Sequence, residues 1–187
     1  MNKWILVLVL LGGVLALWVL GFGQAAGLDS LTGSSAKKLP AESIATYEPL
    51  TIQYTDPVLG FSVRHPIGYV VDSIDGEHVH FFASGPGELS EDFLFKTTNE
   101  TLSFKDLREI ALEIGANPVR EDQVQVNGKT ALRLQAVLPG DELLESGHLI
   151  LGAVPCPEYR LYFTAVIPNS LSDDVALADY VLQTATC

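Results

Sequence analysis

The sequence predicts an α+β domain whose central antiparallel sheet has six or more strands and is flanked by helices, preceded by an N-terminal transmembrane helix. From residue 50 onward, short runs alternate apolar and polar residues between Gly, Pro, Asn and Asp turn residues, as antiparallel strands do. Two later segments change to the 3.6-residue period of helices that are apolar on one side. The chain also begins with an uncharged apolar stretch of the length that crosses a bilayer.

That first stretch, residues 4–22, is 19 residues long and carries no charge. As a helix it would extend about 28 Å, close to the hydrocarbon thickness of a membrane. Lys3 precedes it and favours a cytoplasmic amino terminus. Gly23-Gln24-Ala25 also fits the small-x-small pattern at which a secretory signal is cleaved. Two interpretations stay open, an uncleaved anchor and a signal peptide cut after Ala25, and both deliver the rest of the chain outside the cytoplasm.

The 187 residues suit one domain and a leader. We expect an anchor or signal peptide at 1–25, a flexible linker rich in Gly, Ala and Ser at 26–48, and an extracytoplasmic domain at 49–187. The expected location is the cell membrane, single-pass with the C-terminal domain outside, or the secreted fraction if the leader is cleaved. The net charge of −12, from 23 acidic and 11 basic residues, argues against a nucleic-acid partner, which requires a cationic face.

The first half of the domain is expected to contain five strands. Residues 50–54 and 61–65 alternate apolar and polar side chains and are separated by a turn at Thr55-Asp56-Pro57. Further strands are predicted at the following ranges: 68–71, 78–82 and 93–97. An Asp75-Gly76 turn separates the first two of these.

A helix is predicted next, because apolar residues recur at the spacing i, i+3, i+4, i+7 from Leu107 to Ile114. Ser103 is a suitable N-cap, and Gly115 a suitable C-terminal stop.

The second half of the domain contains the strongest turn signal. Asn127-Gly128 tolerates positive φ at both positions and predicts a hairpin between strands at 123–126 and 129–134. Strands at 148–151 and 159–166 follow. A last helix is expected to begin near Ser170 or Ser172.

The order of these elements resembles the PsbP-like family, of the PsbP/LpqN type, over about residues 50–185. The resemblance rests on Gly60-Phe61-Ser62 after an aromatic residue and a turn, on Pro66 before Gly68-Tyr69, and on the later Asn-Gly hairpin that leads into an Ala-x-x-Leu strand. Tyr69 stands where the family usually has tryptophan. The resemblance implies an α/β/α sandwich around an antiparallel sheet and a non-catalytic accessory or partner-binding role.

Cys156 and Cys187 are the only two cysteines. In an oxidising exterior a pair of cysteines tends to be joined, so we expect a disulfide between them if the last helix packs back across the sheet. Closing a loop of about 30 residues would stabilise the fold by roughly 3–4 kcal/mol. Two free thiols and a bond between chains are the alternatives.

His78 and His80 lie two residues apart in a predicted strand, so both imidazoles point to the same face. Two histidines on one face can begin a zinc or copper site, and His65 and His148 could join them only through the fold. The alternative is a solvent-facing polar stripe opposite a buried Val79.

Asn99-Glu100-Thr101 matches the acceptor pattern for N-glycosylation between a strand and a helix. The sequence contains no nucleophile elbow, zinc-protease or phosphate-loop motif. We therefore expect no enzyme and no cofactor. The predicted function is a non-catalytic accessory protein that engages a protein or envelope partner, and the alternative is a small-ligand or metal carrier that uses the His78 and His80 strand.

Overall fold

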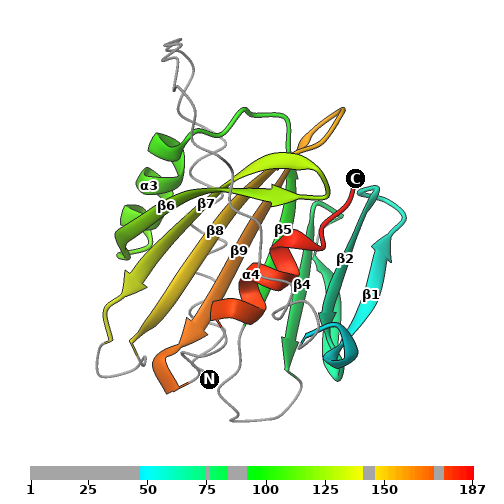
Figure 1. Cartoon of the computed structure of the whole chain (residues 1–187), viewed down its shortest axis with the longest axis horizontal. Helices are drawn as coiled ribbons and strands as arrows, with labels where there is room; N and C mark the ends of the chain where they lie inside the picture. The colour runs from blue at the N-terminus through cyan, green and yellow to red at the C-terminus, as the bar shows by residue number, and fades with distance from the viewer. Residues whose placement is uncertain (1–46, 75, 84–91, 141–145, 171–174) are drawn as a thin grey trace.

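The computed structural model describes residues 47–74, 76–83, 92–140, 146–170 and 175–187. Within these ranges the chain forms a seven-stranded antiparallel sheet, a separate two-stranded sheet and two α-helices, α3 and α4 (Figure 1). The α+β class predicted from the sequence is therefore confirmed. The expected anchor lies outside the described residues, and none of the helices described within them has the length and apolar character to cross a membrane.

The described elements begin with a 3-10 turn, η1, that leads into the first strand. In chain order they are η1 (Glu48–Leu50), β1 (Thr51–Asp56), β2 (Phe61–Pro66), β3 (Tyr69–Ile74), β4 (His78–Ala83), β5 (Asp92–Thr98), α3 (Phe104–Glu113), β6 (Asn117–Val126), β7 (Lys129–Leu138), β8 (Gly147–Pro155), β9 (Arg160–Pro168) and α4 (Val175–Gln183).

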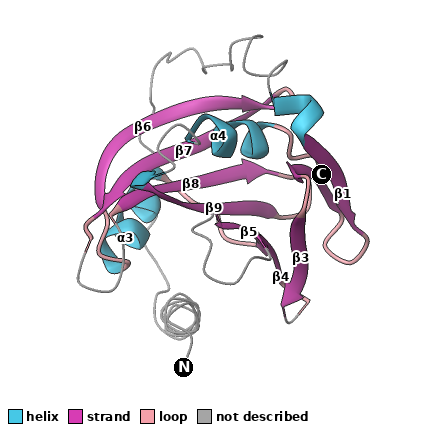
Figure 2. Cartoon of the chain, turned by 90° about the horizontal axis from the view of Figure 1, so that it is seen from below, coloured by secondary structure: helices cyan, strands magenta, loops and turns pink. Residues whose placement is uncertain are grey.

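The large sheet has the strand order β3-β4-β5-β9-β8-β7-β6, with every neighbouring pair antiparallel. The long-range pairing of β5 with β9 joins the two halves of the chain. In Figure 2, β3 and β6 lie at opposite margins of this sheet. Each of these two strands therefore has a strand neighbour on one edge and, among the described residues, none on the other.

The first two strands do not join the large sheet, which has seven strands without them and so agrees with the predicted central sheet of six or more. β1 and β2 form their own antiparallel hairpin. β2 ends at Pro66, which has no N–H to donate to a ladder, and the chain then turns through Ile67 and Gly68, whose φ of +91° suits glycine. The turn sends β3 into the large sheet while the hairpin stays on one of its faces.

One face of the large sheet is covered by α4 and by the β1–β2 hairpin. The hairpin places its rings on the sheet: Tyr54 lies 5.3 Å from Phe81 of β4, and Phe61 lies 5.4 Å from Phe95 of β5, between ring centroids. α4 approaches β8 closely at Gly152, where a Cβ atom would come within 2.8 Å of a methyl carbon of Leu182. A larger residue at that position would require the Leu182 side chain to shift.

The opposite face is covered by α3, which packs over β6, β7 and β8. Leu107 and Ala111 of this helix are fully buried against Leu134 and Leu149 of the sheet. α3 begins with the predicted cap: the Ser103 N–H donates to an Asp106 carboxylate oxygen at 2.6 Å, and the Asp106 N–H donates to Ser103 Oγ at 3.4 Å. The prediction of this helix is therefore confirmed.

The Asn-Gly hairpin is also confirmed, because Asn127 and Gly128 both have positive φ, at 46° and 78°. Its first strand was predicted too short. β6 begins at Asn117, six residues before the predicted start at Gln123. The first half of this edge strand exposes most of its side chains and contains a bulge next to Pro118, so the expected alternation is missing there.

Candidate functional site

The two β4 histidines share the sheet face that is opposite the aromatic core. His78 pairs with Lys96 of β5, and His80 pairs with Leu94. His80 Nε2 lies 3.7 Å from Asp92 Oδ1, and its ring centroid lies 4.8 Å from that of Phe82. His80 is only 7% exposed, so the alternative of a solvent-facing stripe does not hold for this residue. His80 packs against neighbouring side chains on the sheet and is not hydrated as a solvent-facing histidine would be.

The other two histidines lie away from this pair. The His65 ring of β2 packs against Phe81, on the hairpin side of β4, with 4.8 Å between ring centroids. Its Nδ1–H donates to the Pro66 carbonyl oxygen at 3.0 Å. Burial lowers the pKa of His65, which favours its neutral form. His148 pairs with Ile167, a residue of the core beneath α4.

The fold therefore brings neither of them to His78 and His80. Within the described ranges, no three His, Cys, Asp or Glu side chains gather closely enough to hold a metal ion. The metal site at His78 and His80 remains a prediction.

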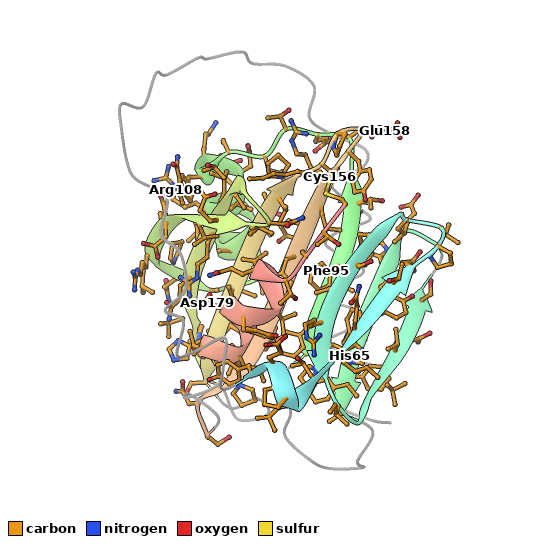
Figure 3. All side chains as sticks on the ribbon, turned by 45° about the vertical axis from the view of Figure 1, so that its right-hand side comes forward. His65, Phe95, Arg108, Cys156, Glu158 and Asp179 are labelled. Atoms are coloured by element: carbon orange, nitrogen blue, oxygen red, sulfur yellow. A yellow bond between two sulfur atoms is a disulfide. The ribbon has the colours of Figure 1, made fainter. Side chains whose placement is uncertain are left out.

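Cys156 and Cys187 form the disulfide expected from the sequence. The sulfurs are 2.05 Å apart, and the bond joins the turn after β8 to the end of the chain, 31 residues later (Figure 3). Cys156 is buried, and its N–H donates to the Tyr159 carbonyl oxygen at 3.0 Å. The same turn reaches the β1–β2 hairpin, because the Tyr159 hydroxyl donates to the Gly60 carbonyl oxygen at 3.1 Å.

The C-terminal tail links this disulfide to the hairpin. Thr186 and Ser62 exchange two backbone hydrogen bonds, of 2.8 and 2.9 Å, and the Arg64 N–H donates to Thr184 Oγ1 at 3.0 Å. The tail therefore pairs with β2 through one isolated antiparallel bridge. Sequence reasoning predicted the covalent bond but not this attachment of the hairpin.

An ion pair between a buried arginine and a largely buried aspartate fixes α4 to the sheet. Arg133 of β7 is 4% exposed and makes a two-pronged contact with Asp179 of α4, through Nε to Oδ1 at 2.5 Å and Nη2 to Oδ2 at 3.1 Å. Its Nη1 lies 3.5 Å from Asp122 of β6, which also pairs with Arg120 at 2.7 Å. Burial raises the pKa of Asp179, and the nearby Arg133 opposes that rise without cancelling it.

This pair was missed by the sequence analysis. A signal was present, since Arg133 interrupts the apolar run of its strand and Asp179 stands between two buried residues of the last helix, Ala178 and Tyr180. A charge on a buried face requires a partner, but the sequence does not say which residue supplies it. In Figure 3, Asp179 is labelled beside the α4 ribbon, which lies in front of the sheet.

A second polar cluster closes the turn of the β1–β2 hairpin. Asp56 is buried and accepts hydrogen bonds from the N–H groups of Val58 and Leu59, at 2.8 and 2.7 Å, and from the Tyr54 hydroxyl at 2.9 Å. These donors lower the pKa of Asp56 although burial acts in the opposite direction. Burial and the Asp56 carboxylate raise the pKa of Tyr54 to about 12. The cluster stabilises a turn.

Asn99 lies in the loop between β5 and α3, where Asn99, Glu100 and Thr101 are all exposed. Within this triplet, the Glu100 N–H donates a hydrogen bond to Thr98 Oγ1 at 3.2 Å. The position is sterically open to a glycan, and its modification remains a prediction.

Comparison with known proteins gives a result at the level of the fold. No family model and no curated protein matches the sequence. The solution structure of cyanobacterial PsbP (CyanoP) from Synechocystis sp. PCC 6803 is similar with a TM-score of 0.55 and 14% identity, covering 86% of this chain and 97% of that one. A crystal structure from Bacteroides thetaiotaomicron VPI-5482 is similar with a TM-score of 0.49 and 12% identity, over 74% of this chain and 48% of that one.

The first of these similarities extends over nearly the whole of both chains. It agrees with the resemblance carried by the sequence motifs between residues 50 and 185. The chain therefore has a PsbP-like fold.

Proposed function

We propose that this chain is a non-catalytic accessory protein, delivered outside the cytoplasm by its N-terminal segment and either anchored in the membrane or secreted, that binds a protein or envelope partner through its PsbP-like domain. The observation that carries the proposal is the Cys156–Cys187 disulfide, which closes the fold at the end of the chain. Disulfides of this structural kind persist in oxidising compartments. Such a compartment is where the uncharged stretch at residues 4–22 would deliver the domain.

The polar groups buried in the domain support a binding role over a catalytic one. Arg133 and Asp179 bond to each other and hold α4, while Asp56 is occupied by two backbone N–H groups and a tyrosine hydroxyl. Each of these groups has a structural task in the described part of the chain. The PsbP-like fold also supports an accessory role, because proteins with this fold are mostly non-catalytic accessory proteins.

A topology experiment on the full chain tests this proposal. We would fuse alkaline phosphatase, which is active only outside the cytoplasm, to the C-terminus and express the fusion in a bacterial host. Membranes would then be washed with alkaline carbonate, and the released and retained protein would be analysed by mass spectrometry. We expect active phosphatase, an oxidised Cys156–Cys187 pair, and either a retained full chain or a form beginning at Ala26.

A matched control carries two arginines, Leu10→Arg and Val14→Arg, in the uncharged stretch. Charged residues at the centre of a membrane helix oppose insertion by about 2.5–3.5 kcal/mol each. This variant should lose phosphatase activity. An inactive parent fusion with reduced cysteines, recovered from the cytosol, would refute the proposal.

A further inference from the structure

The two margins of the large sheet differ in how they are protected. An open strand edge exposes unpaired N–H and C=O groups, and proteins usually shield it with proline, bulges and charges. β6 has all three: Pro118, an irregularity in register between Pro118 and Arg120, and ion pairs at Arg120 and Glu121. The margin at β6 is therefore closed to another strand.

β3 has neither a proline nor a bulge. It pairs with β4 in continuous register from Tyr69 to Ile74 and contains no proline. Among the described residues its other edge has no neighbouring strand. Its one charged residue is Asp72, which is exposed and makes no ion pair with any described residue.

Exposed aliphatic side chains gather beside this edge. We name them the apolar rim: Leu50, Ile52, Ile67 and Val70, with exposures of 59%, 53%, 63% and 38%. The Ile67 N–H donates to the Leu50 carbonyl oxygen at 3.0 Å, so these two residues face each other at the open end of the hairpin. Ile67 leads through one glycine into β3, and Val70 is the second residue of that strand.

Ile52 belongs to the same side of the molecule. β1 lies over the β3–β4 margin, because Tyr54 packs on Phe81 of β4 while β2 is held on the other side by the C-terminal tail. Ile52, two residues before Tyr54, therefore overhangs the edge on the hairpin side, while Val70 flanks the edge on the opposite face of the sheet. A strand added to β3 would contact both.

We propose that the β3 edge is a docking site for an extended segment of a partner protein, which pairs with β3 as an eighth strand and in which apolar residues alternate with basic ones. The backbone ladder would supply affinity, and the side chains would supply selection. Opposite Asp72 the segment would carry a lysine or arginine, and opposite Val70 and below Ile52 it would carry aliphatic residues. This proposal deepens the proposed function, on which it rests, by naming the kind of partner.

Charge selects this occupant over two others. A second copy of the chain would bring another net charge of −12 and, in an antiparallel pairing of two β3 strands, another Asp72 to the same edge. An anionic bilayer would be repelled in the same way. A cationic segment is attracted by the whole domain and is neutralised locally by Asp72.

The test uses the full-length protein in uncharged detergent micelles and two labelled peptides. One peptide, Lys-Val-Val-Val-Lys-Val-Lys, has the proposed pattern, and the other has glutamate in place of lysine. Fluorescence anisotropy measures binding up to about 1 mM peptide, and hydrogen–deuterium exchange compares the amides of β3 with those of β6. We expect the lysine peptide alone to bind and to slow exchange in β3 but not in β6.

Two variants locate the contact. Asp72→Lys replaces attraction by repulsion at the edge and should weaken the lysine peptide about tenfold, while the glutamate peptide gains affinity. Val119→Lys introduces a lysine at an exposed position of β6, where Val119 is 59% exposed. It should leave the dissociation constant of the lysine peptide within about twofold of that of the parent. Melting temperatures close to that of the parent would show that both variants fold.

Several results would overturn the docking site. The first is that amide exchange in β3 does not slow at the highest peptide concentration. The second is that exchange slows equally in β6, and the third is that Asp72→Lys leaves lysine-peptide binding unchanged. Slowing of β3 exchange with rising protein concentration alone would assign the edge to a second copy, and slowing only with anionic vesicles would assign it to a membrane. Peptide binding does not depend on cellular location, so a negative phosphatase result would refute the proposed function without deciding this one.

Discussion

Removal of one partner of the buried Arg133–Asp179 pair should be among the most destabilising single changes in the domain. Arg133→Met keeps most of the apolar stem of the side chain but deletes the guanidinium that donates to both oxygens of Asp179, at 2.5 and 3.1 Å. Asp179, whose side chain is 21% exposed, would then be a largely buried carboxylate with no cation in contact. Leaving one member of such a pair uncompensated costs about 3–5 kcal/mol.

The complementary change should cost less. In Asp179→Leu, Arg133 keeps Asp122 at 3.5 Å and the Gln135 side-chain oxygen at 3.4 Å, so we expect a loss of about 2–3 kcal/mol. The double variant replaces both charges by apolar groups of similar size. Its free energy of unfolding should lie within about 1 kcal/mol of that of the parent. Urea unfolding of the full chain in micelles, followed by far-ultraviolet circular dichroism, measures all four proteins of this cycle.

The pH dependence gives a second test of the same reasoning. Burial raises the pKa of Asp179, and loss of Arg133 would raise it further. A carboxyl whose pKa is higher in the folded state stabilises the fold below its unfolded pKa, and this contribution is lost as the pH rises through the folded pKa. The cost of Arg133→Met should therefore be larger at about pH 8 than in more acidic solution, because the Asp179 carboxyl loses its charge as it takes up a proton. A cost below about 1 kcal/mol, or one that grows on acidification, would refute the assignment.

Three further predictions concern other parts of the domain. Cys156→Ala with Cys187→Ala, or reduction of the parent, should lower the free energy of unfolding by roughly 3–4 kcal/mol in urea titrations, and a parent whose transition ignores reductant would contradict this. Ser103→Ala removes the N-cap of α3 and should cost about 1 kcal/mol in thermal unfolding, whereas Ser103→Asn should recover most of it. Under the alternative metal-carrier function, excess zinc should raise the melting temperature of the parent but not of His78→Gln with His80→Gln, and an unchanged parent would exclude that function.

The features predicted best from the sequence are those set by a few neighbouring residues. The Ser103 cap depends on a residue three positions away, and the hairpin at Asn127 and Gly128 depends on the φ angles that those two residues tolerate. The disulfide was also predictable, because two cysteines allow only one pairing within a chain. In each case the sequence leaves few competing arrangements.

The features that were missed depend on contacts between distant segments. Arg133 and Asp179 are 46 residues apart, and either could have faced another charged residue. The separation of β1 and β2 from the large sheet was not visible either, because alternating apolar residues indicate a strand without indicating its neighbour. The open edge of β3 follows from strand order alone, which no local pattern in the sequence encodes.

These distant contacts also determine where the apolar rim lies. The β1–β2 hairpin shares no ladder with the large sheet, so its position depends on ring packing and on the C-terminal tail. That tail bonds to Ser62 through Thr186, and it is fixed at one end by α4 and at the other by the disulfide. The ion pair at Asp179 in turn fixes α4 to β7.

A change at Asp179 or Cys187 can therefore move Leu50 and Ile52 relative to β3 without touching either residue. Such variants should weaken the lysine peptide less than Asp72→Lys does, because the β3 backbone and its charge remain in place. They should also speed amide exchange in β1 and β2 more than in β9, which lies at the centre of the large sheet. The hairpin, rather than the sheet, is thus the part of the binding edge whose geometry depends on the disulfide.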